Sequence, residues 1–295
     1  MEVDFHFKIN EKTMILIADS GSSKTDWRLV ASDASIQQVK TIGFNPYYQD
    51  STSIAEELKL QLLPKVQEPI TQIYYYGTGI TNSEKSQVLI DAFKSVFPDC
   101  DSIHVHNDML GAARALAGHH SGIVCILGTG SNSCFYDGEQ IAHQVPPLGF
   151  WLGDEGSGGH LGKQLVLAYL HKDLPMDLRD KFEKRYGAKD RLEILDNAYH
   201  KPFPNRYFAS FSKFLFDNRQ HPFIYRLLFD AFTDFFEKYL LKYPEVSQYK
   251  IHFTGSVAFY YSDILRQVAA SKECTVGIIA ETPIAGLTLY HQQSN

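Results

Sequence analysis

The sequence contains few cysteines, no long apolar run and no excess of basic residues. Its four cysteines, Cys100, Cys125, Cys134 and Cys274, include no C-x-x-C pair, which argues against a zinc ribbon or a redox dithiol. No apolar stretch approaches the ~20 residues that a membrane-spanning helix needs, and the first residues lack the apolar core of a signal peptide. We therefore expect free thiols and a cytoplasmic protein with no membrane partner.

The charge balance is slightly acidic. There are 28 Lys and Arg against 34 Asp and Glu, a net charge of −6. A protein that binds a nucleic-acid backbone normally has a basic excess, so we expect no nucleic-acid partner. The 44% hydrophobic content excludes a disordered chain. At roughly 100–200 residues per domain, 295 residues predict two domains.

Periodicity predicts an α/β fold, because strand patterns alternate with helical ones. Ten of the twenty Phe lie within residues 203–243, many at helical spacing, which predicts a packed core. The expected strands are residues 14–18, 25–30, 72–76, 102–106, 123–127, 134–136, 251–254 and 276–279. The expected helices are residues 51–66, 83–97 and 109–117, a largely helical region from 161 to 243, a helix ending near residue 270, and a terminal helix from Pro283.

The common nucleotide-binding motifs are absent. A Walker A loop requires G-x-x-x-x-G-K-[ST] before a helix, but Ser23 precedes Lys24 and Thr25, and a strand pattern follows. A dinucleotide fingerprint requires a third glycine, which the segment Gly128-Thr129-Gly130 lacks. Helix-dipole binding of phosphate is therefore not expected at these two turns.

Two turns of the sequence resemble each other at an offset of 109 residues. Residues 17–23 read IADSGSS and residues 126–132 read ILGTGSN, each between two strand patterns. Small residues let backbone N–H groups approach an anion closely. The two turns are therefore either halves of a phosphate clamp or ordinary hairpin turns.

Two carboxylates follow strands at positions where they could act in catalysis. Asp19 ends the first strand, and it would either hold Mg²⁺ through water or cap a turn. Asp108 precedes the helix of small residues, and it would be a helix N-cap, a substrate base, or both. His104 and His106 lie two residues apart on one strand, but no third metal ligand accompanies them.

Residues 146–162, PPLGFWLGDEGSGGHLG, are the most unusual stretch. They hold six glycines, Trp151 and the acidic pair Asp154 and Glu155. Loops of this composition often line ligand sites. Either acid could bind sugar hydroxyls with Trp151 as a wall, or the stretch could be a plain connection.

These motifs together resemble a known family. DSGSSKT at residues 19–25 and ILGTGSNS at 126–133 resemble the two phosphate loops of the sugar kinase, actin and heat-shock ATPase superfamily. NDMLGAARA at 107–115 and LGDEGSGG at 152–159 resemble the BadF/BadG/BcrA/BcrD ATPase family, which includes N-acetylglucosamine kinases. TGSVA at 254–258 resembles its adenosine motif. The resemblance covers nearly the whole chain, in order.

The resemblance implies two actin-like (ribonuclease H-like) α/β domains with ATP in the cleft between them. It implies an ATP- and Mg²⁺-dependent kinase that acts on an amino sugar such as N-acetylglucosamine, at the C6 hydroxyl. Asp19 would position Mg²⁺ and Asp108 would be the general base. Phosphates would be held by Gly21, Ser22, Ser23, Lys24, Thr25, Gly128, Thr129 and Gly130, adenine by Gly255, Ser256 and Val257, and the sugar by Asn45, Asp108, Ser131, Asn132, Trp151 and Asp154.

The expected domains are residues 1–120, joined by a terminal helix at 283–295, and residues 121–282, with a helical insertion at about 161–243. The first loop departs from the family's usual DGGGTKT, since Ser20 and Ser22 replace glycines and Ser23 replaces threonine. Residues 1–13 have no counterpart, and Met14 is an alternative start. Other functions of this fold are an ATPase activator of a dehydratase or reductase, and a non-catalytic sugar sensor. The exact sugar and the oligomeric state, a homodimer among the options, stay open.

Overall fold

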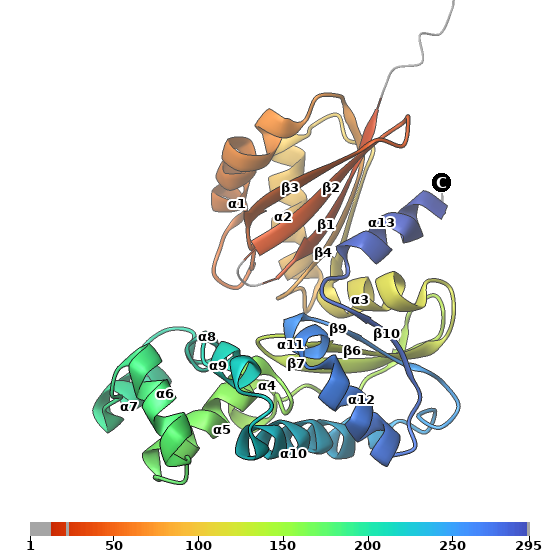
Figure 1. Ribbon diagram of the computed structural model, residues 1–295. Helices are drawn as coiled ribbons and strands as arrows, with labels where there is room; N and C mark the ends of the chain where they lie inside the picture. Colours follow the sequence, from red (N-terminus) through yellow and green to blue (C-terminus); the bar gives the residue numbers. More distant parts are fainter. Residues whose placement is uncertain (1–12, 22–23, 294–295) are drawn as a thin grey trace, which may run out of the picture. The chain divides into compact units, whose positions relative to one another are not determined.

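A computed structural model describes residues 13–21 and 24–293, and it contains two five-stranded sheets with one shared strand order (Figure 1). The first runs β3-β2-β1-β4-β5, and the second, taken from its other edge, runs β8-β7-β6-β9-β10. In each, the central strand pairs antiparallel with the next strand in the chain and parallel with a later one. The α/β fold and the internal repeat predicted from the two turns are therefore confirmed.

The strands follow the predicted positions, with two additions. The first sheet contains β1 (Met14–Ser20), β2 (Lys24–Ala31), β3 (Ile36–Ile42), β4 (Ile70–Gly77) and β5 (Ser102–Asn107). The second contains β6 (Gly122–Leu127), β7 (Ser131–Tyr136), β8 (Ile141–His143), β9 (Ile251–Thr254) and β10 (Val276–Ala280). The edge strands β3 and β8 were not predicted.

The chain divides into two compact units. The first comprises the residues up to Gly111 together with those from Ile284 onward, and the second is Ala112–Pro283. The division falls inside α3 (Asp108–Ala117), earlier than the boundary expected at residue 120. The first turn of α3 packs on the first sheet, because a Cβ at Gly111 would lie 2.8 Å from the Cβ of Tyr76.

In the first unit, two helical segments cover one face of the sheet. α2 (Ser83–Val96) is a regular helix whose N-cap, Asn82, accepts from the backbone N–H of Lys85. The helix expected over residues 51–66 is instead α1 (Ser51–Glu57), the π-helical η1 (Leu58–Leu62) and the 3₁₀ turn η2 (Leu63–Lys65). Pro64 lies in that last turn and cannot donate an α-helical hydrogen bond. The core they cover includes Trp27, Tyr75 and Phe93.

The opposite face of this sheet carries a stack of aromatic rings. Tyr74 and His104 stack at 5.0 Å between ring centroids, and His291 of α13 (Ile284–Gln293) lies 3.8 Å from the ring of Tyr74. The Tyr76 hydroxyl lies 2.9 Å from Nε2 of His291. The histidines of β5 therefore belong to a ring stack that holds the terminal helix on the first unit.

In the second unit, the helices build one large core against the sheet. They are α4 (Gly149–Leu152), α5 (Gly158–Leu170), α6 (Met176–Tyr186), α7 (Arg191–Tyr199), α8 (Pro204–Ala209), α9 (Ser212–Asp217), α10 (Pro222–Lys238), η3 (Leu240–Lys242), α11 (Ser256–Tyr260) and α12 (Ser262–Ser271). Ile224, Leu228, Phe232 and Phe235 of α10 are fully buried, which confirms the predicted Phe-rich core. In the part of the chain that the structure describes, no helix is long and apolar enough to cross a membrane.

Candidate active site

The first predicted phosphate turn joins β1 to β2. Asp19 pairs in register with Asp26 across the hairpin, and the N–H of Gly21 donates to the carbonyl of Lys24 at 3.0 Å. Ser22 and Ser23, which were predicted to bind phosphate, lie outside the described residues. Gly21 is exposed, and a Cβ there would come no closer than 3.8 Å to another atom, the carbonyl oxygen of Lys24, so its backbone can be approached by a ligand.

The hydroxyl groups of Ser20 and Thr25 connect the two strands of this hairpin to the segment that follows β3. The hydroxyls of Ser20 and Thr25 lie 2.7 Å apart, and Thr25 donates to the carbonyl of Ile42 at 2.9 Å. The N–H of Phe44 donates to Oγ of Ser20. The hydroxyl of Thr25, predicted to contact phosphate, is instead used inside the fold, where it ties the turn to the segment that carries Asn45.

Asn45 is held in a fixed orientation beside this turn. Its side-chain oxygen accepts from the N–H of Tyr47 at 3.0 Å. A Cβ at Gly79 would lie 2.6 Å from the same oxygen, and Gly79 has a φ of +79° that favours glycine. The side-chain NH₂ of Asn45 is the donor that this arrangement leaves for a ligand.

Lys24 neutralises Asp26 in the structure. Its Nζ lies 2.9 Å from a carboxylate oxygen of Asp26, and Nζ of Lys40 lies 3.7 Å from the other. The carboxylate of Asp26 is buried, whereas the Lys24 side chain is 55% exposed. The predicted phosphate contact of Lys24 therefore requires its amine to turn away from Asp26. Asp26 would then still have Lys40 as an ion-pair partner.

The first sheet brings Asp19 and Asp108 close together. β1, β4 and β5 are parallel neighbours, and Gly77 pairs with Ser20 on one side and with Asn107 on the other. Burial, then the charge of Asp108, then that of Asp26 raise the pKa of Asp19 to about 7. Burial likewise raises the pKa of Asp108. No local pattern indicated this proximity, because 88 residues separate the two acids; only the family resemblance assigned both to one reaction.

Asp108 is not the N-cap of α3. The side chain of Asn107 accepts from the N–H of Leu110 at 2.8 Å, which is the capping bond. Asp108 is the first helical residue, and the backbone N–H of Met109 partly offsets the effect of burial on its pKa. The N-cap role considered for Asp108 is therefore wrong, and Asn107 is the cap that sequence reasoning missed.

The second predicted phosphate turn, Gly128–Gly130, is attached to the glycine-rich stretch. The carbonyls of Gly128 and Thr129 accept from the N–H groups of Gly158 and Gly159 at 2.8 and 3.0 Å. A Cβ at Gly159 would lie 3.1 Å from the oxygen of Thr129. The glycines of this stretch therefore brace the turn, while the N–H of Gly128 bonds the carbonyl of Gly130.

Asp154 reaches the same turn from the glycine-rich stretch. It is 7% exposed and has a φ of +61°, and its Oδ1 accepts from the N–H of Ser131 at 3.2 Å. A Cβ at Gly130 would lie 3.0 Å from its carboxylate. Burial raises the pKa of Asp154, and the Ser131 bond lowers it. The structure thus brings two predicted sugar-binding residues together.

The other predicted residues of this unit each contact different neighbours. Oδ1 of Asn132 accepts from Nε2 of Gln144 at 2.6 Å, and Trp151 is 51% exposed and stacks on Tyr199 at 5.4 Å. Gly255 has a φ of +108°, and a Cβ added there would lie 3.1 Å from the backbone N of Gly128. The predicted adenine residues therefore begin beside the second turn. Ser256, which follows Gly255, is exposed, and Val257 is buried.

Glu155, the sequence alternative to Asp154, has its carboxylate oxygens occupied inside the fold. Oε1 accepts from Nζ of Lys238 and Oε2 from the hydroxyl of Tyr239, both at 2.9 Å. These partners follow Glu155 by 83 and 84 residues, so no local pattern indicated them. Glu155 is a structural acid.

Comparison with solved structures decides the family. A candidate N-acetylglucosamine kinase from Porphyromonas gingivalis is 42% identical to this chain; the match covers 95% of this chain and 99% of that chain, with a TM-score of 0.90. This chain belongs to the N-acetylglucosamine kinase-like family of sugar kinases. A scan against protein-family models and a search of curated proteins find no match.

More distant members of the same fold are similar over nearly their whole length. A candidate N-acetylglucosamine kinase from Chromobacterium violaceum is 17% identical, with 95% of this chain and 98% of that chain covered and a TM-score of 0.72. A ROK family glucokinase from Streptomyces griseus, solved with glucose and AMPPNP, is 13% identical, with 95% and 99% covered and a TM-score of 0.59. These likenesses support the two-domain actin-like sugar-kinase fold.

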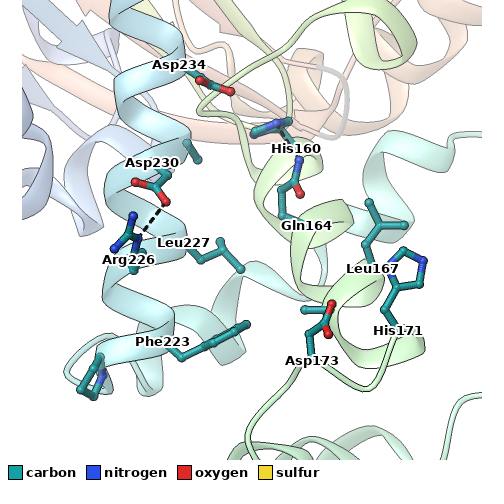
Figure 2. A pocket seen from close by; sticks show the side chains of 13 residues that line it. His160, Gln164, Leu167, His171, Asp173, Phe223, Arg226, Leu227, Asp230 and Asp234 are labelled. Atoms are coloured by element: carbon teal, nitrogen blue, oxygen red, sulfur yellow. Dashed lines mark hydrogen bonds and ion pairs between the residues drawn. The ribbon is translucent and has the colours of Figure 1, made fainter.

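The second unit contains a cavity that lies among its helices. It has a volume of about 670 Å³ and opens between α5 and α10 (Figure 2). His160 and Gln164 line it from α5, and Arg226, Asp230 and Asp234 line it from α10. None of the predicted site residues lines this cavity, so its size alone does not mark it as the catalytic site.

Proposed function

We propose that this chain is an ATP-dependent kinase that phosphorylates an amino sugar, N-acetylglucosamine or a close relative, on its C6 hydroxyl. The observation that carries this proposal is the pair Asp19 and Asp108 at one end of the first sheet. Burial raises the pKa of both carboxyls, and the charge of Asp108 raises that of Asp19 further. An acid pair of this kind suits a base next to a metal site. Family membership supports a sugar as the acceptor.

Asp108 is the proposed general base. Its raised pKa brings a carboxylate closer to the pH at which it accepts a proton from a sugar hydroxyl. Because Asn107 caps α3, the Asp108 carboxylate is available for this role. In phosphoryl transfer, positioning and electrostatic stabilisation supply most of the rate, so Asp108 also serves to orient the hydroxyl.

Asp19 fits a magnesium role. Mg²⁺ keeps several waters and is bound by one or two carboxylates plus phosphate oxygens, and no group of three or more potential ligands was found among residues 13–21 and 24–293. The like charges of Asp108 and Asp26 raise the pKa of Asp19, and a cation relieves such repulsion. Mg²⁺ held by Asp19 through water would neutralise charge on the transferred phosphoryl group.

The remaining predicted residues take the roles that the family resemblance implies. The backbone of Gly21–Thr25 and of Gly128–Gly130 would bind the phosphates of ATP, and residues 255–257 would bind adenine. Asn45, Ser131, Asn132, Trp151 and Asp154 would bind the sugar. We place the reaction in the cytoplasm, and we take the two compact units as the two domains.

An ADP-release assay over a panel of sugars tests the proposal. N-acetylglucosamine, glucosamine, N-acetylmuramate and glucose are each offered with ATP and Mg²⁺, and the product is analysed for a 6-phosphate. ADP release that depends on an amino sugar supports the kinase. Sugar binding without ADP release would instead indicate the sensor function, and sugar-independent ATP hydrolysis would indicate the activator.

A further inference from the structure

The backbone of Asp154 needs to be held in place. Its φ of +61° lies in the left-handed region, which costs an L-residue of order 1 kcal/mol even where Asp tolerates it. Its carboxylate is also buried, and burial raises its pKa. The hydrogen bond from the N–H of Ser131 is long at 3.2 Å. Further contacts must therefore keep Asp154 in this conformation.

The residues on both sides of Asp154 contact one hydroxyl group, that of Tyr239. A Cβ at Gly153 would lie 2.6 Å from this hydroxyl, so the hydroxyl takes the place of a side chain there. The same hydroxyl donates to Oε2 of Glu155 at 2.9 Å. Tyr239 therefore fixes the chain immediately before and immediately after Asp154.

Lys238 completes this arrangement on a rigid support. Its Nζ donates to Oε1 of Glu155 at 2.9 Å and lies 3.4 Å from Asp234. α10 ends at Lys238, and its Phe235 is fully buried. A Cβ at Gly156 would lie 3.1 Å from the Cβ of Phe235. Residues 153–156 thus rest on the end of a helix that the core immobilises.

The pKa shifts of Glu155 and Lys238 are those of a charged ion pair in the folded protein. Burial alone would raise the pKa of Glu155, but the hydrogen bonds from Lys238 and Tyr239 outweigh it and hold the pKa below its usual value. The bond to Glu155 raises the pKa of Lys238. Removing one partner would leave a buried carboxylate only partly satisfied, which is costly.

We propose that Glu155, Lys238 and Tyr239 form an anchor that positions Asp154 for the sugar substrate. The inference rests on the proposed function, because it assigns Asp154 to sugar binding. The three anchor residues are positioning residues: they act on the sugar through Asp154 and the backbone of residues 153–156. Loss of the anchor lets Asp154 leave its left-handed conformation and release the N–H of Ser131.

The decisive variant is Tyr239→Phe, which removes the hydroxyl and keeps the ring. We expect its KM for the sugar to rise about tenfold, within the range for losing one hydrogen bond to a charged group, while its KM for ATP stays within about twofold. Glu155→Gln should act in the same direction. Tyr225→Phe is the matched control, because it removes a tyrosine hydroxyl from α10, the helix that ends just before Tyr239. That hydroxyl donates to Gln267 at 2.7 Å and has no contact with residues 153–156, so this variant should match the wild type.

Two further measurements separate positioning from general destabilisation. Hydrogen–deuterium exchange at the amide of Ser131 should become faster in Tyr239→Phe, since that amide loses Asp154, and Tyr225→Phe should leave it unchanged. The double variant Asp154→Asn with Tyr239→Phe should have the same sugar KM as Asp154→Asn alone. Three results would overturn the anchor. They are an unchanged sugar KM in Tyr239→Phe, an equal rise in the KM for ATP, and a double variant whose sugar KM shows the full effects of both substitutions.

The outcomes also separate this inference from the proposed function. If the wild type phosphorylates no sugar, the proposed function fails, and Ser131 exchange still decides whether Tyr239 positions Asp154. If the wild type is active and Asp154→Asn leaves the sugar KM unchanged, Asp154 does not bind the sugar and the anchor has no role in recognition. If Asp154→Asn raises the KM and Tyr239→Phe does not, the function stands and the anchor is wrong.

Discussion

Replacing His160 by Gln should make the protein less sensitive to acid. His160 lies in α5, is 8% exposed, and lines the cavity in Figure 2. Nε2 of His160 lies 3.2 Å from the side-chain nitrogen of Gln164, and its Nδ1 is buried without a hydrogen-bond partner. Burial first, and the charge of Lys163 second, lower the pKa of His160 from 6.5 to about 4.

The sign and size of the effect follow from these pKa values. Between pH 6.5 and pH 4 the unfolded chain binds a proton at His160 that the folded protein does not bind, so stability falls as the pH falls. The loss is near zero at pH 8 and about 2 kcal/mol at pH 5, from the two pKa values. A proton on Nε2 would also remove the acceptor that Gln164 uses.

The assay compares urea unfolding of the wild type and His160→Gln at pH 8 and pH 5. Relative to the wild type, His160→Gln should gain about 2 kcal/mol in unfolding free energy on going from pH 8 to pH 5. His171→Gln is the control, because His171 lines the same cavity but is exposed, and it should follow the wild type. An unchanged difference between the wild type and His160→Gln at both pH values would refute the reasoning.

Three further predictions concern the first unit. Asp108→Asn should retain ATP binding and lower kcat by about 10² or more in the ADP-release assay; near-normal turnover would contradict the base assignment. Gly111→Ala should lower the unfolding free energy by about 1–3 kcal/mol in urea titrations, because its Cβ would lie 2.8 Å from that of Tyr76. A urea midpoint equal to that of the wild type would contradict this, because it would mean that α3 can shift to make room for the new Cβ without loss of stability. Asp19→Asn should abolish Mg²⁺-dependent activity. It should also raise the melting temperature in EDTA more at pH 8 than at pH 5. The wild type loses stability as the pH rises from the ordinary Asp pKa of 3.8 to the pKa of about 7, because over that range the folded protein holds a proton that the unfolded chain releases.

Local patterns predicted most of the elements and failed where packing decides the conformation. The buried central strands β1 and β6 were predicted from apolar runs. β3 was missed because it is an edge strand with polar Gln37, Gln38 and Lys40 and little buried surface. The expected single helix over residues 51–66 was wrong in its second half, where π and 3₁₀ turns precede and include Pro64.

The candidate site divides in the same way. The two turns, Asp19 and Asp108 were nominated because they follow strand patterns, and the glycine-rich stretch was nominated for its composition. The inward hydroxyl of Thr25, the capping role of Asn107 and the pairing of Lys24 with Asp26 were not, because each depends on which neighbour the fold supplies. Local sequence patterns could therefore nominate candidate residues, but the partners of their side chains came from the fold.

The sequence by itself determined the α/β class, the repeat at an offset of 109 residues and the family resemblance, because turn chemistry and hydrophobic period are local properties of a chain. Only the tertiary structure decided that the charge of Asp108 acts on Asp19 and that Asp154 takes a left-handed backbone conformation. It also decided that Glu155 bonds to side chains 83 and 84 residues further along the chain. Those features arise from the register of parallel strands and from the packing of a helix end against a loop, and no local pattern encodes either.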